Sequence, residues 1–178
     1  MKRVLLLTGK PGTGKTALIK EAIALLRAKR DNLQSGGFYT EEMRSGGVRQ
    51  GFRIITLDGK EATLAHINIS TPYQVSKYKI DIDSLNKVGV SALRQALKET
   101  NLVVVDEIGK MELFSPQFRE AVSQAIDSNK KVLGTIMLKP HPFADRIKKH
   151  PEVKTLVVTR ANYNEVLGEV LNWLTEEA

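Results

Sequence analysis

Residues Gly9-Lys10-Pro11-Gly12-Thr13-Gly14-Lys15-Thr16 fit the pattern G-x-x-x-x-G-K-[ST] at every required position. Glycines allow the backbone to curl tightly, so that consecutive N–H groups point at phosphate oxygens. A helix that follows adds the positive end of its dipole. Lys15 then reaches the β- and γ-phosphates, and the Thr16 hydroxyl ligates Mg²⁺. The stretch predicts a phosphate-binding loop, a P-loop, that holds a nucleoside triphosphate.

The segments around this loop predict an α/β fold. The short apolar run from Arg3 to Thr8 has the character of a buried strand, and apolar residues recur at helical spacing from about Lys15 to Arg30. Further along, apolar runs near residues 102–107, 131–137 and 153–159 alternate with helix-period segments. This alternation is typical of a mostly parallel central sheet flanked by helices, a three-layer arrangement.

One region has a different texture. Between residues 36 and 69, three short apolar segments are separated by the turns Ser45-Gly46-Gly47 and Asp58-Gly59-Lys60. Such spacing predicts an antiparallel β-meander. We therefore expect residues 1–178 to form one P-loop domain with a β-rich insertion at 36–69.

The composition restricts the function classes. The 178 residues include no cysteine and only three histidines, which excludes disulfides and thiolate metal sites and argues against a histidine zinc site. No apolar run is long enough to cross a bilayer, and Val4 to Leu7 is too short for the core of a signal peptide. We expect a cytoplasmic protein without a membrane partner, and a monomer is the default expectation.

The net charge is +7, which raises the question of a nucleic-acid partner. The basic residues are spread along the chain, and aromatic residues make up only 6%. A stacking platform for bases is therefore not visible, and we do not expect nucleic acid to be the main ligand.

An acidic pair ends the apolar run that begins at Leu102. Asp106 occupies the place of a Walker-B aspartate, and we expect its strand to lie beside the P-loop strand, where the carboxylate holds Mg²⁺ directly or through water. Glu107 follows and is expected to point into the crevice at the carboxyl end of the sheet. A carboxylate there can take a proton from an attacking water, so Glu107 is the predicted catalytic base.

Four stretches together resemble a known family: the P-loop Gly9 to Thr16, then GFYTEEMR at 37–44, Gly51-Phe52, and DEIGKMEL at 106–113. They are similar to the thermophile-type nucleoside-triphosphate phosphatases, whose vertebrate members are called cancer-related nucleoside-triphosphatases. The resemblance implies a RecA-like P-loop fold and Mg²⁺-dependent hydrolysis of ATP, GTP, CTP and UTP to diphosphate and phosphate. It also implies that one segment lies against the nucleotide, namely Leu102, Val103, Val104, Val105, Asp106, Glu107, Ile108 and Gly109.

The chain departs from the family pattern in one place. Many members carry Asn-Arg near the start of the last helix, whereas here Asn162 is followed by Tyr163. A role for an arginine at this position therefore does not carry over.

Hydrolysis requires positive charge on the transferring phosphoryl group beyond Mg²⁺ and Lys15. Lys110 is the first candidate because it comes three residues after Glu107. Arg44 and Arg53 on the meander, and Arg146 beyond two prolines, are alternatives. Thr135, at the end of the next strand, is a candidate sensor of the γ-phosphate.

Two other functions fit the same motifs. A nucleoside or nucleotide kinase would transfer the phosphoryl group to an acceptor in place of water. A kinase should avoid positioning water, whereas Glu107 is expected to position it, and this counts against a kinase. A nucleic-acid-stimulated ATPase would account for the charge of +7. A hydrolase acting on free nucleotides is the main hypothesis.

Overall fold

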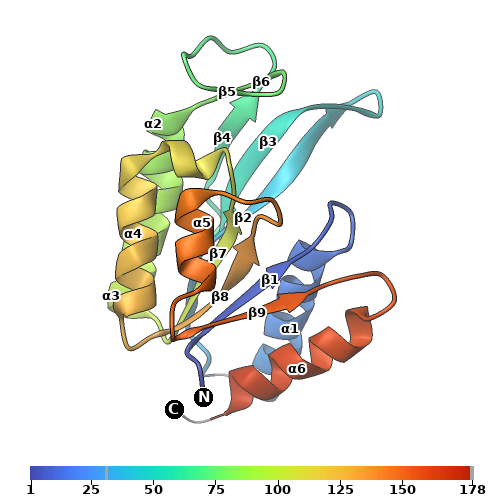
Figure 1. Ribbon diagram of the computed structural model, residues 1–178, viewed down its shortest axis with the longest axis vertical. Coiled ribbons are helices and arrows are strands. Elements are labelled where there is room, and N and C mark those ends of the chain that lie inside the picture. The colour runs from blue at the N-terminus through green and yellow to red at the C-terminus, as the bar shows by residue number, and fades with distance from the viewer. Residues whose placement is uncertain (31, 177–178) are drawn as a thin grey trace.

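The computed structural model describes residues 1–30 and 32–176. Its strands form a nine-stranded sheet in the order β5-β6-β4-β3-β2-β7-β8-β1-β9. Helices cover both faces of the half that contains β1, so the predicted three-layer α/β fold is confirmed (Figure 1).

The half of the sheet that carries the P-loop is parallel. It pairs β2 with β7, β7 with β8, β8 with β1 and β1 with β9. Strands covered by helices on both faces must be apolar almost throughout, which explains runs such as Val-Leu-Leu-Leu in β1. The bounds of these strands are β1 Val4–Thr8, β2 Ser35–Ser45, β7 Leu102–Ile108, β8 Lys131–Ile136 and β9 Val153–Val157.

Two groups of helices enclose this half of the sheet. The helices α1 (Lys15–Lys29) and α6 (Tyr163–Thr175) pack on one face, where their apolar side chains share a core with Leu5, Leu7 and Val104. On the other face, Val4, Leu6 and Val105 share a core with α3 (Ser91–Glu99), α4 (Pro116–Asp127) and α5 (Pro142–Lys148). Figure 1 shows the two groups on opposite sides of the sheet.

The order of the central strands corrects one expectation. The strand that ends in Asp106, β7, does not lie beside the P-loop strand β1, because β8 is inserted between them and pairs with both. The run from Lys131 to Ile136 is itself almost entirely buried, so it belongs at the centre rather than at an edge. Asp106 still reaches the P-loop, because it lies near the carboxyl end of β7, where its carboxylate accepts a hydrogen bond from Thr16.

The predicted meander forms, but it is continuous with the parallel half. β2 pairs antiparallel with β3 (Val48–Thr56), and β3 pairs antiparallel with β4 (Glu61–His66). The first four residues of β2 also pair in parallel with β7. β2 is therefore a member of both halves of the sheet. The polar stretch after β4 adds two short strands, β5 (Gln74–Val75) and β6 (Tyr78–Ile80).

The helix expected near Ser84 to Glu99 has three parts. A short α2 (Ile82–Ser84) is capped by Asp81, whose carboxylate accepts from the Ser84 amide at 3.0 Å. A π-helical turn, η1 (Leu85–Val90), joins α2 to α3, which is the third part. Elsewhere in the chain, a 3₁₀ turn, η2 (Glu112–Phe114), follows β7. Within the described ranges, no helix is both long and apolar enough to cross a membrane.

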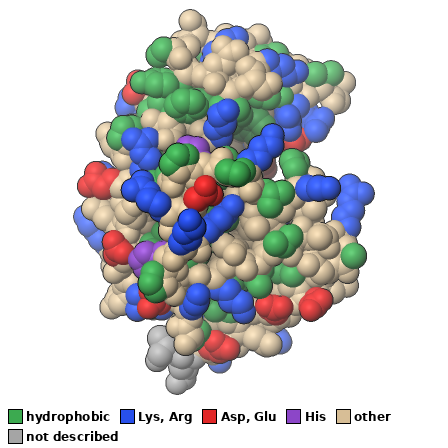
Figure 2. Space-filling model, viewed as in Figure 1, with side chains coloured by type: hydrophobic (Ala, Val, Ile, Leu, Met, Phe, Trp, Pro, Cys, Tyr) green, Lys and Arg blue, Asp and Glu red, His purple; other side chains and the backbone are tan. Residues whose placement is uncertain are grey.

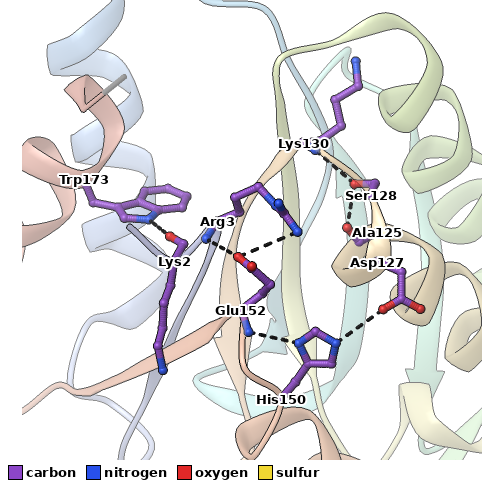
Figure 3. Close-up of polar contacts among 9 residues, drawn as sticks. All are labelled: Lys2, Arg3, Ala125, Asp127, Ser128, Lys130, His150, Glu152 and Trp173. Atoms are coloured by element: carbon purple, nitrogen blue, oxygen red, sulfur yellow. Dashed lines mark hydrogen bonds and ion pairs between the residues drawn. The ribbon is translucent and has the colours of Figure 1, made fainter. Parts of the chain in front are cut away.

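The amino ends of β1 and β9 are held by polar contacts between segments that lie far apart in the sequence (Figure 3). The Trp173 indole donates to the Lys2 carbonyl at 2.8 Å, which ties α6 to the start of β1. Glu152 accepts from the Arg3 amide at 3.4 Å, and the Glu152 amide in turn donates to Nδ1 of His150 at 3.1 Å. Each of these polar groups has a partner within the chain.

Candidate active site at the carboxyl ends of the parallel strands

The P-loop joins β1 to α1 and has room only for glycine at two of its positions. A side chain on Gly9 would place its Cβ 2.5 Å from the carbonyl oxygen of Val158. Gly14 has a φ of +89°, and a Cβ there would lie 3.2 Å from the Tyr163 ring. The loop is therefore packed against the segment between β9 and α6. The Val158 carbonyl excludes a side chain at Gly9, and the positive φ of Gly14 favours glycine there.

Lys15 lies across the loop that precedes it. Its Nζ donates to the carbonyl oxygens of Gly9 at 2.9 Å and Lys10 at 3.0 Å, and the Thr13 hydroxyl donates to the same Lys10 carbonyl at 3.0 Å. Both acceptors of the ammonium group are neutral. An anion in the loop would offer Lys15 stronger, charge-assisted hydrogen bonds than these carbonyls do.

Asp106 is the polar centre of the site and is only 3% exposed. Its two carboxylate oxygens accept from different hydroxyls, Thr16 at 2.5 Å and Thr135 at 2.6 Å. Burial raises the pKa of Asp106, and the hydrogen bonds from Thr135 and Thr16 oppose that rise. Thr135 at the end of β8 thus bridges the gap between β7 and the P-loop, and its hydroxyl is directed at Asp106.

The donors at this point fit a magnesium ion. Thr16 and Asp106 offer hard oxygen atoms side by side at the mouth of the P-loop. Mg²⁺ in nucleotide sites takes only one or two protein oxygens and completes its shell with phosphate oxygens and water. In the part of the chain that is described, no group of three or more His, Asp or Glu is arranged as a metal cage. The site therefore suits an ion that arrives with a phosphate ligand.

Glu107 is half-buried next to this centre. A β-bulge interrupts the β7–β8 ladder between Val105 and Ile108, and it breaks the regular alternation of side chains at the acidic pair. Burial raises the pKa of Glu107, the negative charge of Asp106 raises it further, and Lys15 opposes the rise. The structure thus brings Glu107, Asp106 and Lys15 together, as the sequence predicted.

A third acid, Glu112, was not foreseen as part of the site. It is 4% exposed, and its Oε2 and the Oε1 of Glu107 lie 2.9 and 2.5 Å from the position that a Cβ on Gly109 would take. Burial raises the pKa of Glu112 well above its ordinary value, and the charge of Glu107 adds to the effect. The available signal was an acid between Met111 and Leu113, whose apolar side chains mark a buried turn.

Comparison with known proteins places this geometry in a family. The profile of the NTPase family matches residues 4–171. The chain belongs to the NTPase family. It is 46% identical over 170 residues to the nucleoside-triphosphatase THEP1 of Thermotoga maritima, an alignment that covers 96% of this chain and 94% of that one.

Solved structures of family members have the same fold. The crystal structure of THEP1 from the hyperthermophile Aquifex aeolicus superimposes with a TM-score of 0.85 at 33% identity, covering 97% of this chain and 99% of that one. The solution structure of a human cancer-related nucleoside triphosphatase gives a TM-score of 0.82 at 35% identity, with both chains fully covered. The family resemblance drawn from the four sequence stretches is therefore confirmed.

The segment that the family pattern placed against the nucleotide reaches the P-loop only in part. Leu102 and Val104 are buried in the core beneath α1 and α6, and Val103, Val105 and Ile108 are buried in the opposite core. These side chains are enclosed because β7 runs through the centre of a sheet covered on both faces. Of the segment, only its end brings polar side chains to the site, and contact of residues 102–105 with the nucleotide stays a prediction.

The arginine candidates for charge neutralisation are engaged elsewhere. Arg44 pairs with Glu42 at 2.7 Å, and Arg53 lies 3.3 Å from Glu41. Arg146 stacks over the Phe143 ring, 5.6 Å from its centroid.

Lys110 is exposed and takes part in none of the ion pairs found among the described residues. Its catalytic role stays a prediction. Figure 2 shows other lysine and arginine side chains scattered over the visible face with acidic side chains among them, rather than gathered in one basic patch.

Sequence reasoning also missed a cation near Asp106. Lys20 lies one helical turn after Thr16 on α1, with its Nζ 5.0 Å from the centroid of the Tyr39 ring, and its charge favours the ionised form of Asp106. Burial raises the pKa of Tyr39 to about 12, to which the charge of Asp106 contributes. The spacing of four residues from Thr16 was the signal that could have identified Lys20.

Proposed function

We propose that the protein hydrolyses nucleoside triphosphates to diphosphate and phosphate in the presence of Mg²⁺, with broad tolerance of the base. The observation that carries the proposal is the half-buried carboxylate of Glu107, whose pKa is influenced by both Asp106 and Lys15 at the P-loop. The nucleoside-triphosphatase names of the relatives support the same reaction class.

The residues of the P-loop would bind the triphosphate. The loop amides and the helix dipole of α1 attract the phosphate oxygens. Lys15 would exchange the carbonyls of Gly9 and Lys10 for oxygens of the β- and γ-phosphates, which are stronger acceptors. Mg²⁺, held by Thr16 and Asp106, would supply further positive charge on the same phosphates.

Glu107 would act on the attacking water. As the water oxygen forms its bond to the γ-phosphorus, the carboxylate accepts the proton, and the bond from the γ-phosphorus to the bridging oxygen breaks. A raised pKa makes Glu107 a better proton acceptor at neutral pH than an ordinary surface glutamate. Lys15 and the loop amides stabilise the charge that develops on the phosphoryl oxygens.

We expect base tolerance because the residues proposed to bind and hydrolyse the substrate act on its phosphates and not on its base. Lys15, Thr16, Asp106 and Glu107 all address phosphates, the ion or the water, and these are common to ATP, GTP, CTP and UTP. A site built on these residues has no means of rejecting one base in favour of another.

The test is phosphate release from each of the four triphosphates with Mg²⁺ and no added acceptor. We expect release from all four and a fall of about 10²- to 10⁴-fold in kcat for Glu107→Gln. Glu152→Gln is the matched control, because it changes a partly exposed glutamate at the opposite end of the sheet. Release that requires a nucleoside acceptor would identify a kinase instead, and unchanged release in Glu107→Gln would require another base.

The same assay addresses the nucleic-acid alternative. A hydrolase of free nucleotides should turn over at the same rate with and without added RNA or DNA. Polynucleotide stimulation that weakens steeply with salt would favour the nucleic-acid-stimulated ATPase.

A further inference from the structure

The strand order gives the P-loop two distinct sides. Asp106 and Glu107 lie at the end of β7, on the side of β1 that also carries β8, whereas β9 pairs with the opposite edge of β1. If the γ-phosphate lies near Glu107, as the proposed function requires, the nucleoside end of the substrate extends toward the loop between β9 and α6. Figure 1 shows this loop and the P-loop at the same edge of the sheet.

One aromatic residue occupies that side. Tyr163, the first residue of α6, is half-exposed, and its ring carbons Cε2 and Cδ2 lie 3.2 and 3.5 Å from the Cβ position of Gly14. Among residues 158–163 it is the sole aromatic side chain. Its ring therefore borders the P-loop on the flank away from the acidic pair.

The ring is held in place at several points. The Tyr163 hydroxyl donates to Oε2 of Glu21 on α1 at 2.8 Å, and burial together with this partner raises the pKa of Tyr163 to about 12. The preceding Asn162 accepts from the Thr159 amide at 2.7 Å and donates to the Val157 carbonyl at 2.8 Å. The loop and the ring are thus held by contacts within the chain, so little ordering is needed when a ligand binds.

We propose that the Tyr163 ring is the platform on which the base or ribose of the bound nucleotide stacks. The inference rests on the proposed function, because it takes the direction of the triphosphate from the position of Glu107. An aromatic face stacks on any of the four bases without reading their hydrogen-bonding edges. A substrate-binding role for Tyr163 thereby supplies affinity for the nucleoside while preserving base tolerance.

The experiment compares nucleotides with a ligand that has no nucleoside. Dissociation constants for ATP, GTP, CTP, UTP and inorganic tripolyphosphate are measured by calorimetry in the Glu107→Gln background, so that turnover does not consume the ligands. Tyr163→Leu removes the aromatic face and keeps an apolar side chain beside Gly14, and Tyr163→Phe keeps the ring but loses the bond to Glu21. If the leucine variant does not fold, Tyr163→Met replaces it.

We expect Tyr163→Leu to weaken all four nucleotides by about 5- to 100-fold, the range for loss of one base–aromatic stack. Tripolyphosphate should bind as before, and Tyr163→Phe should retain most of the nucleotide affinity. Equal weakening of nucleotides and tripolyphosphate would mean that the ring only shapes the P-loop, and unchanged nucleotide affinity would remove it from the site. Either result overturns the proposal.

The two proposals fail in different ways. The proposed function fails if the wild-type protein releases no phosphate, whatever the binding constants are. The stacking proposal fails if the Glu107→Gln protein with Tyr163 intact binds tripolyphosphate as tightly as it binds nucleotides, even when the wild-type protein releases phosphate.

Discussion

The two ends of the parallel sheet each contain a lysine that donates to backbone carbonyls, but the two arrangements differ in kind. At the amino end, Lys131 donates to the carbonyls of Trp173 at 2.7 Å and Glu176 at 2.6 Å, which are among the last carbonyls of α6 and would otherwise lack a partner. At the carboxyl end, Lys15 donates to two carbonyls of the P-loop itself. The first lysine completes a helix, and the second is ready to exchange its partners for an anion.

The acids show the same contrast. Glu152, at the amino end, has Arg3 and the Arg3 amide beside it. Glu107 and Glu112, at the carboxyl end, both approach Gly109, and the charge of Glu107 raises the pKa of Glu112 beyond the effect of burial. Paired polar groups stabilise the fold, whereas buried charges of one sign identify a place where the fold gives up stability for chemistry.

Of the changes that test the contrast between the two ends, removal of Lys15 should have the largest effect. Lys15→Ala should lower kcat/KM for ATP by about 10²- to 10³-fold, the size of effect that follows loss of one donor to a developing charge. The free energy of unfolding without ligand should change little, because the Thr13 hydroxyl still donates to the Lys10 carbonyl and only one neutral acceptor, the Gly9 carbonyl, loses its side-chain donor. The measurement combines phosphate release with urea unfolding, and a large loss of stability with intact turnover would reverse the assignment.

The matched change at the other end should have the opposite signature. Lys131→Ala should lower the free energy of unfolding by about 1 to 2 kcal/mol, because it removes charged hydrogen bonds to the end of α6. Turnover of ATP should be unchanged at a temperature where the variant is folded. Loss of turnover in the folded variant would show that the two ends are coupled, and the comparison would then fail.

The smallest expected effect is on the pH dependence of stability, and it comes from replacing Glu112. Because its pKa is raised in the folded state, the folded protein holds this proton more firmly than the unfolded chain, and stability falls as the pH rises above the ordinary value of 4.5. Glu112→Gln has no such dependence, so it should be more stable than wild type at pH 8 by on the order of 1 kcal/mol.

The advantage of Glu112→Gln should shrink toward zero near pH 4, where the carboxyl is protonated in both states. Urea unfolding at several pH values gives the measurement. Glu152→Gln, which loses its pairing with Arg3, is the control and should be slightly less stable than wild type at pH 8. A Glu112→Gln protein that is less stable than wild type at pH 8 would contradict the raised pKa.

Much of the fold could be predicted from the sequence because its signals are local. The P-loop pattern, the strand before it and the helix after it are set by neighbouring residues, and α1 ends at Lys29, within one residue of the expected end. The meander could be predicted for the same reason, because the turns at Gly46 and Gly59 are local signals that separate its strands. Periodicity carries no information about which strands lie side by side, so the insertion of β8 between β1 and β7 was missed.

For the candidate site, too, local patterns could be predicted from the sequence and long-range contacts could not. Two local patterns identified four residues of the site: the P-loop pattern gave Lys15 and Thr16, and the apolar run that ends in acid gave Asp106 and Glu107. The structure brings these two pairs together. Tyr163 owes its position to a long-range contact, the packing of its ring against Gly14, and Glu112 is recognised as part of the site only by its burial in the folded chain. A single sequence without aligned relatives does not reveal such long-range contacts.

The double membership of β2 also has a consequence for how the chain folds. Its antiparallel neighbour β3 follows within a few residues, whereas its parallel neighbour β7 lies far along the chain. Closing a short hairpin has a small entropic cost and is fast, but parallel pairing must bring together distant segments. We expect the β2–β3 hairpin to form early and then serve as the edge onto which β7 and its acidic end assemble. Folding order would thus bring Asp106 and Glu107 into place only after the hairpin has formed.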